Sequence, residues 1–195
     1  MKVIFVCGLG GDAGMTYVKS LKILCEKKGF EFFAPSMPSF EERITYEKYV
    51  ERFEKLVKKE RIDLADVLLI GQSAGTNFAV KYFANHPTEL KGYISVSGFS
   101  KGADRNLPEG ALKKLSVIEG FRPTEKEYEV FKNFKFPKFS VFGGKDCFFT
   151  KENLEDYASL IGAKKFYDKD GVHCTISENI TTHGLLHKVI EENFW

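Results

Sequence analysis

Short apolar runs alternate along the chain with longer segments in which apolar residues recur every three or four positions. The short runs are rich in β-branched and aromatic residues and end at Gly, Pro or Asp, which is typical of strands. Their alternation with helical segments predicts an α/β fold whose mainly parallel sheet has about six strands. The predicted strands are Lys2 to Cys7, Phe30 to Ala34, Asp66 to Gly71, Gly92 to Ser97, Phe139 to Gly143 and Lys164 to Tyr167.

Helical periodicity fills most of the sequence between these runs, so we expect helices on both faces of the sheet. The ends of these segments carry residues that cap or stop helices, namely threonine before a helix and glycine or proline after it. The expected helices run from about Gly14 to Lys28, from near Thr45 through Val57, from Ser73 to His86, from Thr150 to Ile161, and through Leu185 to Ile190.

The stretch from Ser100 to Pro137 is longer than an ordinary connection between strand and helix. It contains Pro108 and Pro123, followed by the capping-box pattern Thr124-x-x-Glu127. We interpret it as a small helical insertion, or lid, over one end of the sheet. A plain crossover helix with irregular flanks is the alternative. Either way, residues 1–195 are expected to form a single domain.

Composition excludes several classes of protein. The 195 residues are 43% hydrophobic, which is enough for one core, and the net charge of +2 lacks the positive field that nucleic-acid binding requires. No apolar run is long enough to span a membrane. The four cysteines form no C-x-x-C pair, so we expect reduced thiols, a cytoplasmic location, and neither a metal nor another cofactor. A protein partner cannot be inferred.

The sequence Gly71-Gln72-Ser73-Ala74-Gly75 fits the pattern G-x-S-x-G and lies where a buried strand meets a helix. In this setting the glycines allow a sharp turn that exposes the serine hydroxyl at the carboxyl end of the sheet. The helix N-terminus favours negative charge beside it. We therefore predict Ser73 as a nucleophile; a glycine-rich turn that packs tightly or binds phosphate is the alternative.

A serine nucleophile needs a histidine base at the same edge of the sheet. His173 follows the last predicted strand and is the first candidate, while His183, near the start of the final helix, is the alternative base. His86 and His187 lie within helical segments and are expected to be structural or solvated.

The acid that orients the base is expected to follow a strand as well. Asp146 comes shortly after the fifth strand, and Asp168 and Asp170 are alternatives that lie closer to His173 in sequence. The order Ser73, Asp146, His173 is the order of nucleophile, acid and base in α/β-hydrolases.

Two backbone N–H groups are needed to bind the oxyanion of an acyl-transfer intermediate. We assign them to Ala74 and to Leu9, in the glycine-rich loop after the first strand, with Gly10 as the alternative to Leu9. Gly8, Gly10 and Gln72 are expected to contact the substrate. Dinucleotide binding by this loop is disfavoured because no acidic residue closes the second strand.

These motifs resemble the α/β-hydrolase superfamily and, within it, the small serine hydrolases of the retinoblastoma-binding-protein-9-like (YdeN-like) family. The matching segments span nearly the whole chain: Gly8-Leu9-Gly10-Gly11, Ala34-Pro35-Ser36-Met37-Pro38, Gly71-Gln72-Ser73-Ala74-Gly75, Val96-Ser97-Gly98, Gly143-Gly144-Lys145-Asp146 and Gly171-Val172-His173. The resemblance implies a Ser-Asp-His triad at Ser73, Asp146 and His173. Departures from the family pattern are Gln72 in place of His, Cys7 in place of the His of an HG pair, and Val172 in place of Gly.

The predicted function is hydrolysis of small acyl substrates, mainly carboxylic esters, through an acyl-enzyme. Thioesterase, peptidase and lactonase activities would use the same groups, and a non-catalytic binding module on the same fold is a further alternative. Phenylalanines cluster before and after the fifth strand, where most are expected in the core, with contact of two of them with the substrate as the alternative. Cys7, Cys147 and Cys174 lie at predicted strand ends, where they are expected to be small apolar fillers.

Overall fold

The sheet has six strands in the order β2-β1-β3-β4-β5-β6, and every pairing is parallel. The computed structural model describes the chain except residues 12–13, 109–114 and 174–180, and describes residues 181–183 by their backbone only. The predicted α/β fold is confirmed, and each strand lies within one residue of its predicted bounds. The strands are β1 Lys2–Val6, β2 Glu31–Phe33, β3 Val67–Gln72, β4 Gly92–Val96, β5 Lys138–Gly143 and β6 Lys164–Asp168.

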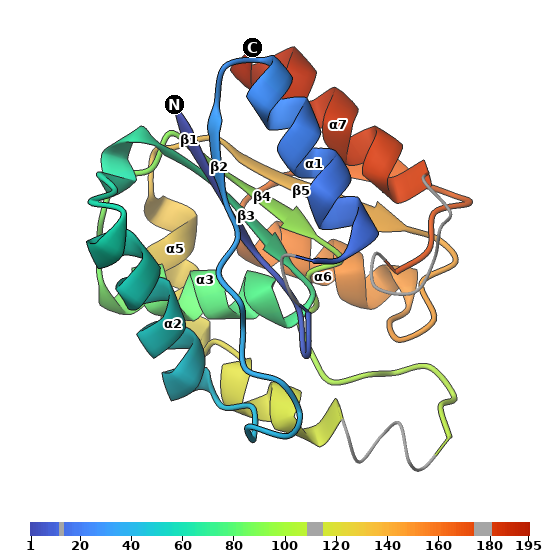
Figure 1. Ribbon diagram of the computed structural model, residues 1–195. Coiled ribbons are helices and arrows are strands. Elements are labelled where there is room, and N and C mark those ends of the chain that lie inside the picture. Colours follow the sequence, from blue (N-terminus) through green and yellow to red (C-terminus); the bar gives the residue numbers. More distant parts are fainter. Residues whose placement is uncertain (12–13, 109–114, 174–180) are drawn as a thin grey trace.

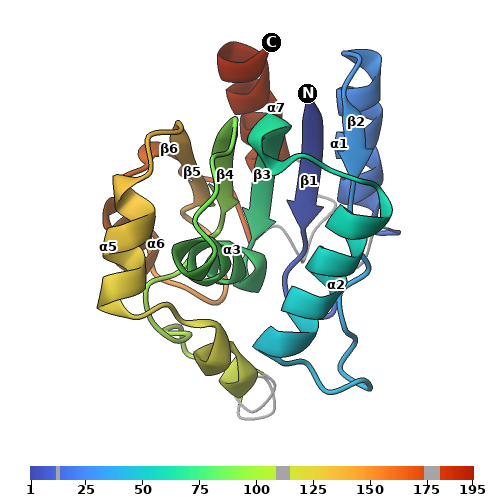
Figure 2. The same cartoon turned by 90° about the vertical axis from the view of Figure 1, so that its left-hand side faces the viewer.

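Helices cover both faces of this sheet (Figures 1 and 2). Helices α1 and α7 pack side by side on one face, while α2, α3, α5 and α6 cover the other. The strands of a parallel sheet carry apolar side chains on both faces, so both faces must be covered by helices. The helices are α1 Thr16–Lys27, α2 Tyr46–Lys59, α3 Ala74–Asn85, α5 Glu125–Asn133, α6 Lys151–Leu160 and α7 Thr181–Phe194, with 3₁₀ helices η1 Leu64–Asp66 and η2 Ser116–Phe121.

The predicted helix ends have the expected local chemistry. The hydroxyls of Thr45, Thr124 and Thr150 each accept a hydrogen bond from the backbone N–H three residues later, at the starts of α2, α5 and α6. Gly29 and Gly162 follow α1 and α6 with φ of +78° and +68°, a conformation that glycine adopts without a steric penalty.

The stretch from Ser100 to Pro137 contains the short 3₁₀ helix η2 followed by helix α5. Helix α5 packs against α3 and α6 and serves as the crossover between β4 and β5. Before it, η2 lies on the side of the sheet where the strands end, and its Phe121 is fully buried. Residues 109–114 lie outside the described part of the chain. That the insertion acts as a lid stays a prediction.

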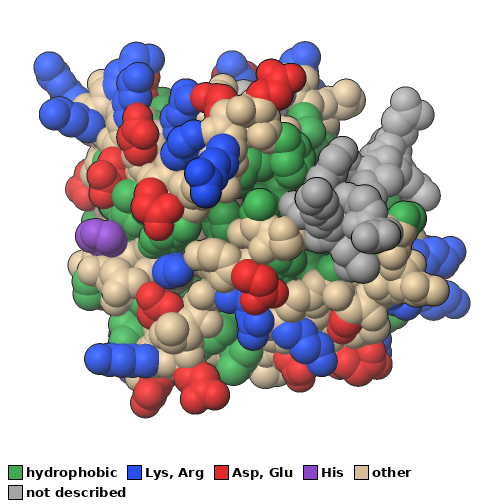
Figure 3. Space-filling model, turned by 90° about the horizontal axis from the view of Figure 1, so that it is seen from below, with side chains coloured by type: hydrophobic (Ala, Val, Ile, Leu, Met, Phe, Trp, Pro, Cys, Tyr) green, Lys and Arg blue, Asp and Glu red, His purple; other side chains and the backbone are tan. Residues whose placement is uncertain are grey.

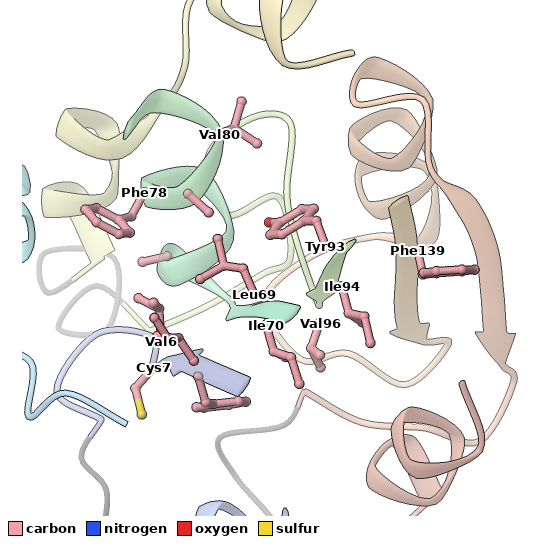
Figure 4. Packing of buried hydrophobic residues seen from close by; sticks show 14 of the residues in the cluster. Val6, Cys7, Leu69, Ile70, Phe78, Val80, Tyr93, Ile94, Val96 and Phe139 are labelled. Carbon is pink, nitrogen blue, oxygen red and sulfur yellow. The ribbon is translucent and has the colours of Figure 1, made fainter. Parts of the chain in front are cut away.

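The core lies between the sheet and its helices. In Figure 4, Leu69 of β3 and Tyr93 of β4 point toward α3, while Ile70 and Val96 point to the opposite face. The Tyr93 hydroxyl donates to the Thr76 carbonyl of α3 at 3.1 Å, and burial raises the pKa of Tyr93 far above its ordinary value. The hydrogen bond of the buried Tyr93 hydroxyl thus attaches α3 to β4, the strand that follows it.

All six strands run in the same direction, so their carboxyl ends meet at one edge of the sheet. This edge is at the bottom of Figure 1 and faces the viewer in Figure 3. Hydrophobic, basic and acidic side chains are interspersed over that face. Within the described residues, no helix is both long and apolar enough to cross a membrane.

Candidate active site

Ser73 occupies a strained turn between β3 and α3. Its φ of 52° and ψ of −123° lie outside the regions that non-glycine residues ordinarily adopt, at a cost of about 1–3 kcal/mol. The backbone N–H of Ser73 donates to the Val96 carbonyl at 2.8 Å, which ties the turn to the end of β4. The backbone therefore has the shape expected of a nucleophile elbow.

Gly71 and Gly75 lie so close to neighbouring backbone atoms that neither position has space for a side chain. A Cβ on Gly75 would lie 2.2 Å from the Val6 carbonyl oxygen, and one on Gly71 would lie 2.8 Å from the Gly75 oxygen. Both distances are far below van der Waals contact. The end of β1, the elbow and the first turn of α3 can approach each other this closely only without side chains.

Replacing Gly75 with alanine is expected to lower the free energy of unfolding by at least ~2 kcal/mol, because α3 must move away from β1. Gly184→Ala is the matched control: Gly184 lies in α7, and no atom of the described residues lies within 4 Å of its added Cβ. That change should raise stability by up to about 1 kcal/mol through helix propensity. Urea denaturation measures both, and a Gly75→Ala protein as stable as the wild type would contradict the contact.

Asp146 and His173 form a buried pair at the carboxyl edge. The His173 Nδ1 lies 2.7 Å from the Asp146 Oδ2, and the two residues are 1% and 2% exposed. The other oxygen of Asp146 accepts hydrogen bonds from the backbone N–H groups of Phe148 and Phe149, at 2.9 and 3.1 Å. The carboxylate is thus held on one side by its own loop and is directed at the imidazole on the other.

Two glycines that sequence reasoning left unexplained bring the loops of Asp146 and His173 together. A Cβ on Gly143 would lie 2.1 Å from the Gly171 carbonyl oxygen, which also accepts a hydrogen bond from the Lys145 N–H at 2.8 Å. The loops after β5 and β6 therefore meet backbone to backbone. Glycines in both predicted strand-end loops were the available signal for this contact.

The other candidate acids and bases either make different contacts or lie outside the described residues. Asp170 pairs with Lys145 at 2.8 Å, and Asp168 accepts from the backbone N–H of Asp170. His86 stacks on Tyr82 at the end of α3, as expected of a structural residue. His187 is half-buried in α7, and burial lowers its pKa. The side chain of His183, the alternative base, lies outside the described residues.

The predicted oxyanion loop lies beside Ser73. A Cβ on Gly8 would lie 2.9 Å from the Ser73 Cβ, so the two backbones are in contact. The Gly8 N–H donates to Gln72 Oε1 at 2.9 Å, and Gln72 is fully buried. Leu9 and Gly10 are partly exposed. The oxyanion role of Leu9 and Ala74, and substrate contacts by Gly8, Gly10 and Gln72, stay predictions.

Aromatic side chains surround this edge. Phe148 is partly exposed and meets the His173 ring edge-on at 4.8 Å between centroids, and Phe149 is buried beside it. The remaining phenylalanines singled out near β5 are core or partly buried, as mostly expected: Phe131, Phe134, Phe136, Phe139 and Phe142.

One aromatic residue near the loop was missed by sequence reasoning. Phe40 is 49% exposed, and a Cβ on Gly10 would lie 2.9 Å from its ring. Nothing local in the sequence distinguishes it from the many phenylalanines of the core.

The cysteines at strand ends differ in environment. Cys7 is buried at the end of β1, whereas Cys147 is exposed next to Asp146. Partial burial and the Asp146 carboxylate raise the pKa of the Cys147 thiol, which lowers its thiolate fraction at neutral pH. Cys174 lies outside the described residues.

A groove of about 660 Å³ elsewhere on the described surface contains none of these groups. It lies between α5 and α6 and is lined by residues that include Tyr128, Asp156 and Leu160. The candidate site is therefore assigned from the chemistry at the strand ends and not from cavity size.

The sequence model of the alpha/beta hydrolase fold family matches residues 2–125, which is more than half of the chain. The chain belongs to the alpha/beta hydrolase fold family. In this family the nucleophile, acid and base follow strands in the order found here for Ser73, Asp146 and His173. No curated protein matches the chain in sequence.

Solved structures similar to this alpha/beta hydrolase fold protein include the ydeN gene product of Bacillus subtilis, with a TM-score of 0.81, 18% identity, and coverage of 99% of this chain and 98% of that one. A monoacylglycerol lipase from Paleococcus ferrophilus has a TM-score of 0.72, 16% identity, and coverage of 98% and 92%. Est1E from Butyrivibrio proteoclasticus has a TM-score of 0.71, 14% identity, and coverage of 98% and 87%. At these identities the likeness shows the fold, and it confirms the expected resemblance to YdeN at that level.

Proposed function

We propose that the protein is a serine hydrolase of small acyl esters in which Ser73 is the nucleophile, His173 the base and Asp146 the orienting acid. The observation that carries the proposal is the buried Asp146–His173 pair, 2.7 Å long, at the sheet edge where Ser73 stands in a strained turn. A buried imidazole bonded to a carboxylate through Nδ1 keeps Nε2 free to accept a proton. Strain and a buried polar pair at one edge are typical of a catalytic site.

The proposed reaction has two halves. Ser73 Oγ attacks the carbonyl carbon of the ester while its proton passes to His173 Nε2, and the N–H groups of Ala74 and Leu9 bind the resulting oxyanion. As the tetrahedral intermediate collapses, its C–O bond to the alkoxy group breaks and the imidazolium protonates the alkoxy oxygen, which releases the alcohol and leaves Ser73 acylated. Water attacks the acyl-enzyme with His173 again as base, releasing the carboxylic acid and restoring the Ser73 hydroxyl.

Two partly exposed aromatic rings support an apolar substrate. Phe148 lies against His173, and Phe40 lies against Gly10 of the oxyanion loop. Aromatic surface beside a few directed polar groups is the usual composition of a small-molecule site. We infer that acyl or alcohol groups of short to medium length contact these rings.

Labelling with a fluorophosphonate probe tests the proposal, with the modified peptide mapped by mass spectrometry. Covalent modification at Ser73 is expected, together with turnover of p-nitrophenyl esters of graded chain length. Acyl thioesters and p-nitroanilides in the same assay separate esterase from thioesterase and peptidase activity. A protein that neither reacts with the probe nor hydrolyses any of these substrates would be a binding module on the hydrolase fold.

A further inference from the structure

The peptide group between Gly8 and Leu9 is held through its carbonyl oxygen. The Tyr49 hydroxyl donates to the Gly8 oxygen at 2.9 Å, and the Gly11 N–H donates to the same oxygen at 3.1 Å. In a trans peptide the N–H points away from the carbonyl, so a fixed Gly8 carbonyl also fixes the direction of the Leu9 N–H. Three of the four residues from Gly8 to Gly11 are glycines, so this loop has few side chains whose packing could set the direction of the Leu9 N–H.

Tyr49 is itself rigidly placed. It lies on α2, is fully buried, and packs edge-on against Phe121 at 4.7 Å and against Phe78 at 5.8 Å between ring centroids. Burial raises the pKa of Tyr49 far above its ordinary value, so the hydroxyl keeps its proton at any working pH. The Tyr49 hydroxyl therefore has a fixed position and stays protonated as the donor to the Gly8 carbonyl.

A second side chain holds the other end of Gly8. The Gln72 Oε1 accepts from the Gly8 N–H at 2.9 Å and from the Tyr17 hydroxyl at 3.0 Å. Gln72 is the last residue of β3 and immediately precedes Ser73. The Gln72 side chain thus ties Gly8, in the loop after β1, to the elbow by a hydrogen bond.

We propose that Tyr49 and Gln72 are positioning residues: Tyr49 holds the carbonyl of the Gly8–Leu9 peptide group and Gln72 holds the N–H of the Cys7–Gly8 peptide group, so that the Leu9 N–H is directed at the acyl oxygen bound beside Ser73. The inference rests on the proposed function. Oxyanion donors accelerate acyl transfer because they are oriented before the reaction begins. A hydrogen bond to the Gly8 carbonyl also polarises the peptide group and strengthens its N–H as a donor.

Tyr49→Phe tests this inference because it removes only the hydroxyl. The Gly8 carbonyl keeps the Gly11 N–H, so no buried acceptor is left unpaired and the fold should persist. For ester hydrolysis kcat is expected to fall about ten-fold with KM nearly unchanged, since the oxyanion forms only in the transition state. Tyr128→Phe is the matched control, because the buried Tyr128 hydroxyl has no hydrogen-bond partner among the residues that the structure describes.

An alkylboronic acid supplies the second readout. It forms a tetrahedral adduct with a serine oxygen and places one of its own oxygens at the oxyanion position, so Tyr49→Phe should weaken its inhibition by the same factor as kcat/KM. Gln72→Met should act in the same direction. Equal kinetics and inhibition in the Tyr49→Phe and Tyr128→Phe proteins would overturn the positioning role while the wild type remains active. A wild type without turnover would overturn the proposed function itself.

Discussion

Replacing Ser73 with alanine is expected to lower kcat for ester hydrolysis by roughly 10⁶-fold and to abolish fluorophosphonate labelling. The oxyanion donors and substrate contacts would remain, but no acyl-enzyme could form without the Oγ. Alanine fits the elbow as well as serine does, because both carry a Cβ at φ of 52°. Steady-state kinetics and intact-protein mass spectrometry measure the two effects.

Ser97→Ala is the matched control for this change. Ser97 follows β4 and has a φ of 51°, and its buried hydroxyl forms no hydrogen bond within the described part of the chain. It therefore repeats the backbone strain of Ser73 at the neighbouring strand end. Labelling and turnover that persist in Ser73→Ala, or that disappear in Ser97→Ala alone, would remove Ser73 from the role of nucleophile.

Replacing Asp146 with asparagine is expected to lower kcat by about 10⁴-fold while the protein remains folded. The asparagine oxygen can still accept the backbone N–H groups of Phe148 and Phe149, so the loop keeps its bonds. Its NH₂ group then faces His173 Nδ1 and donates to it. The imidazole is forced into the tautomer with the proton on Nε2, which cannot accept a proton from Ser73.

Asp170→Asn controls for the loss of a carboxylate near this edge, since the Asp170 carboxylate forms an exposed pair with Lys145. Its activity should match that of the wild type. Thermal unfolding monitored by circular dichroism checks that Asp146→Asn is folded. A folded Asp146→Asn protein with wild-type kcat would show that another group orients the base.

Much of the fold could be predicted because its signals are local. Strand ends lie within one residue of prediction where Gly, Pro or Asp follows a β-branched run, and threonine caps marked three helices in advance. The pairing of Asp146 with His173 followed from topology, because parallel strands bring their carboxyl ends to one edge.

The contacts that support the site could not be predicted. They are hydrogen bonds between residues distant in sequence, and the spacing of apolar residues carries no information on where a side-chain hydroxyl or amide will bind. Tyr49 belongs to the apolar stripe of α2, and nothing in that stripe indicates that its hydroxyl reaches Gly8. The substrate contact of Gln72 stays a prediction, and nothing around Gln72 in the sequence indicates that its side chain accepts a hydrogen bond from the Gly8 N–H. The two side chains that hold the backbone of Gly8 thus come from β3 and α2 without any shared sequence signal.

The position of β1 inside the sheet bears on how the chain folds. Strand β1 precedes both of its neighbours in the sequence, and it pairs on one side with Glu31–Phe33 and on the other with residues from Val67 onward. On the ribosome it must therefore wait for more than a third of the chain before both neighbours exist. Such non-local parallel pairing slows folding and leaves the apolar run from Val3 to Val6 open to off-pathway association in the meantime.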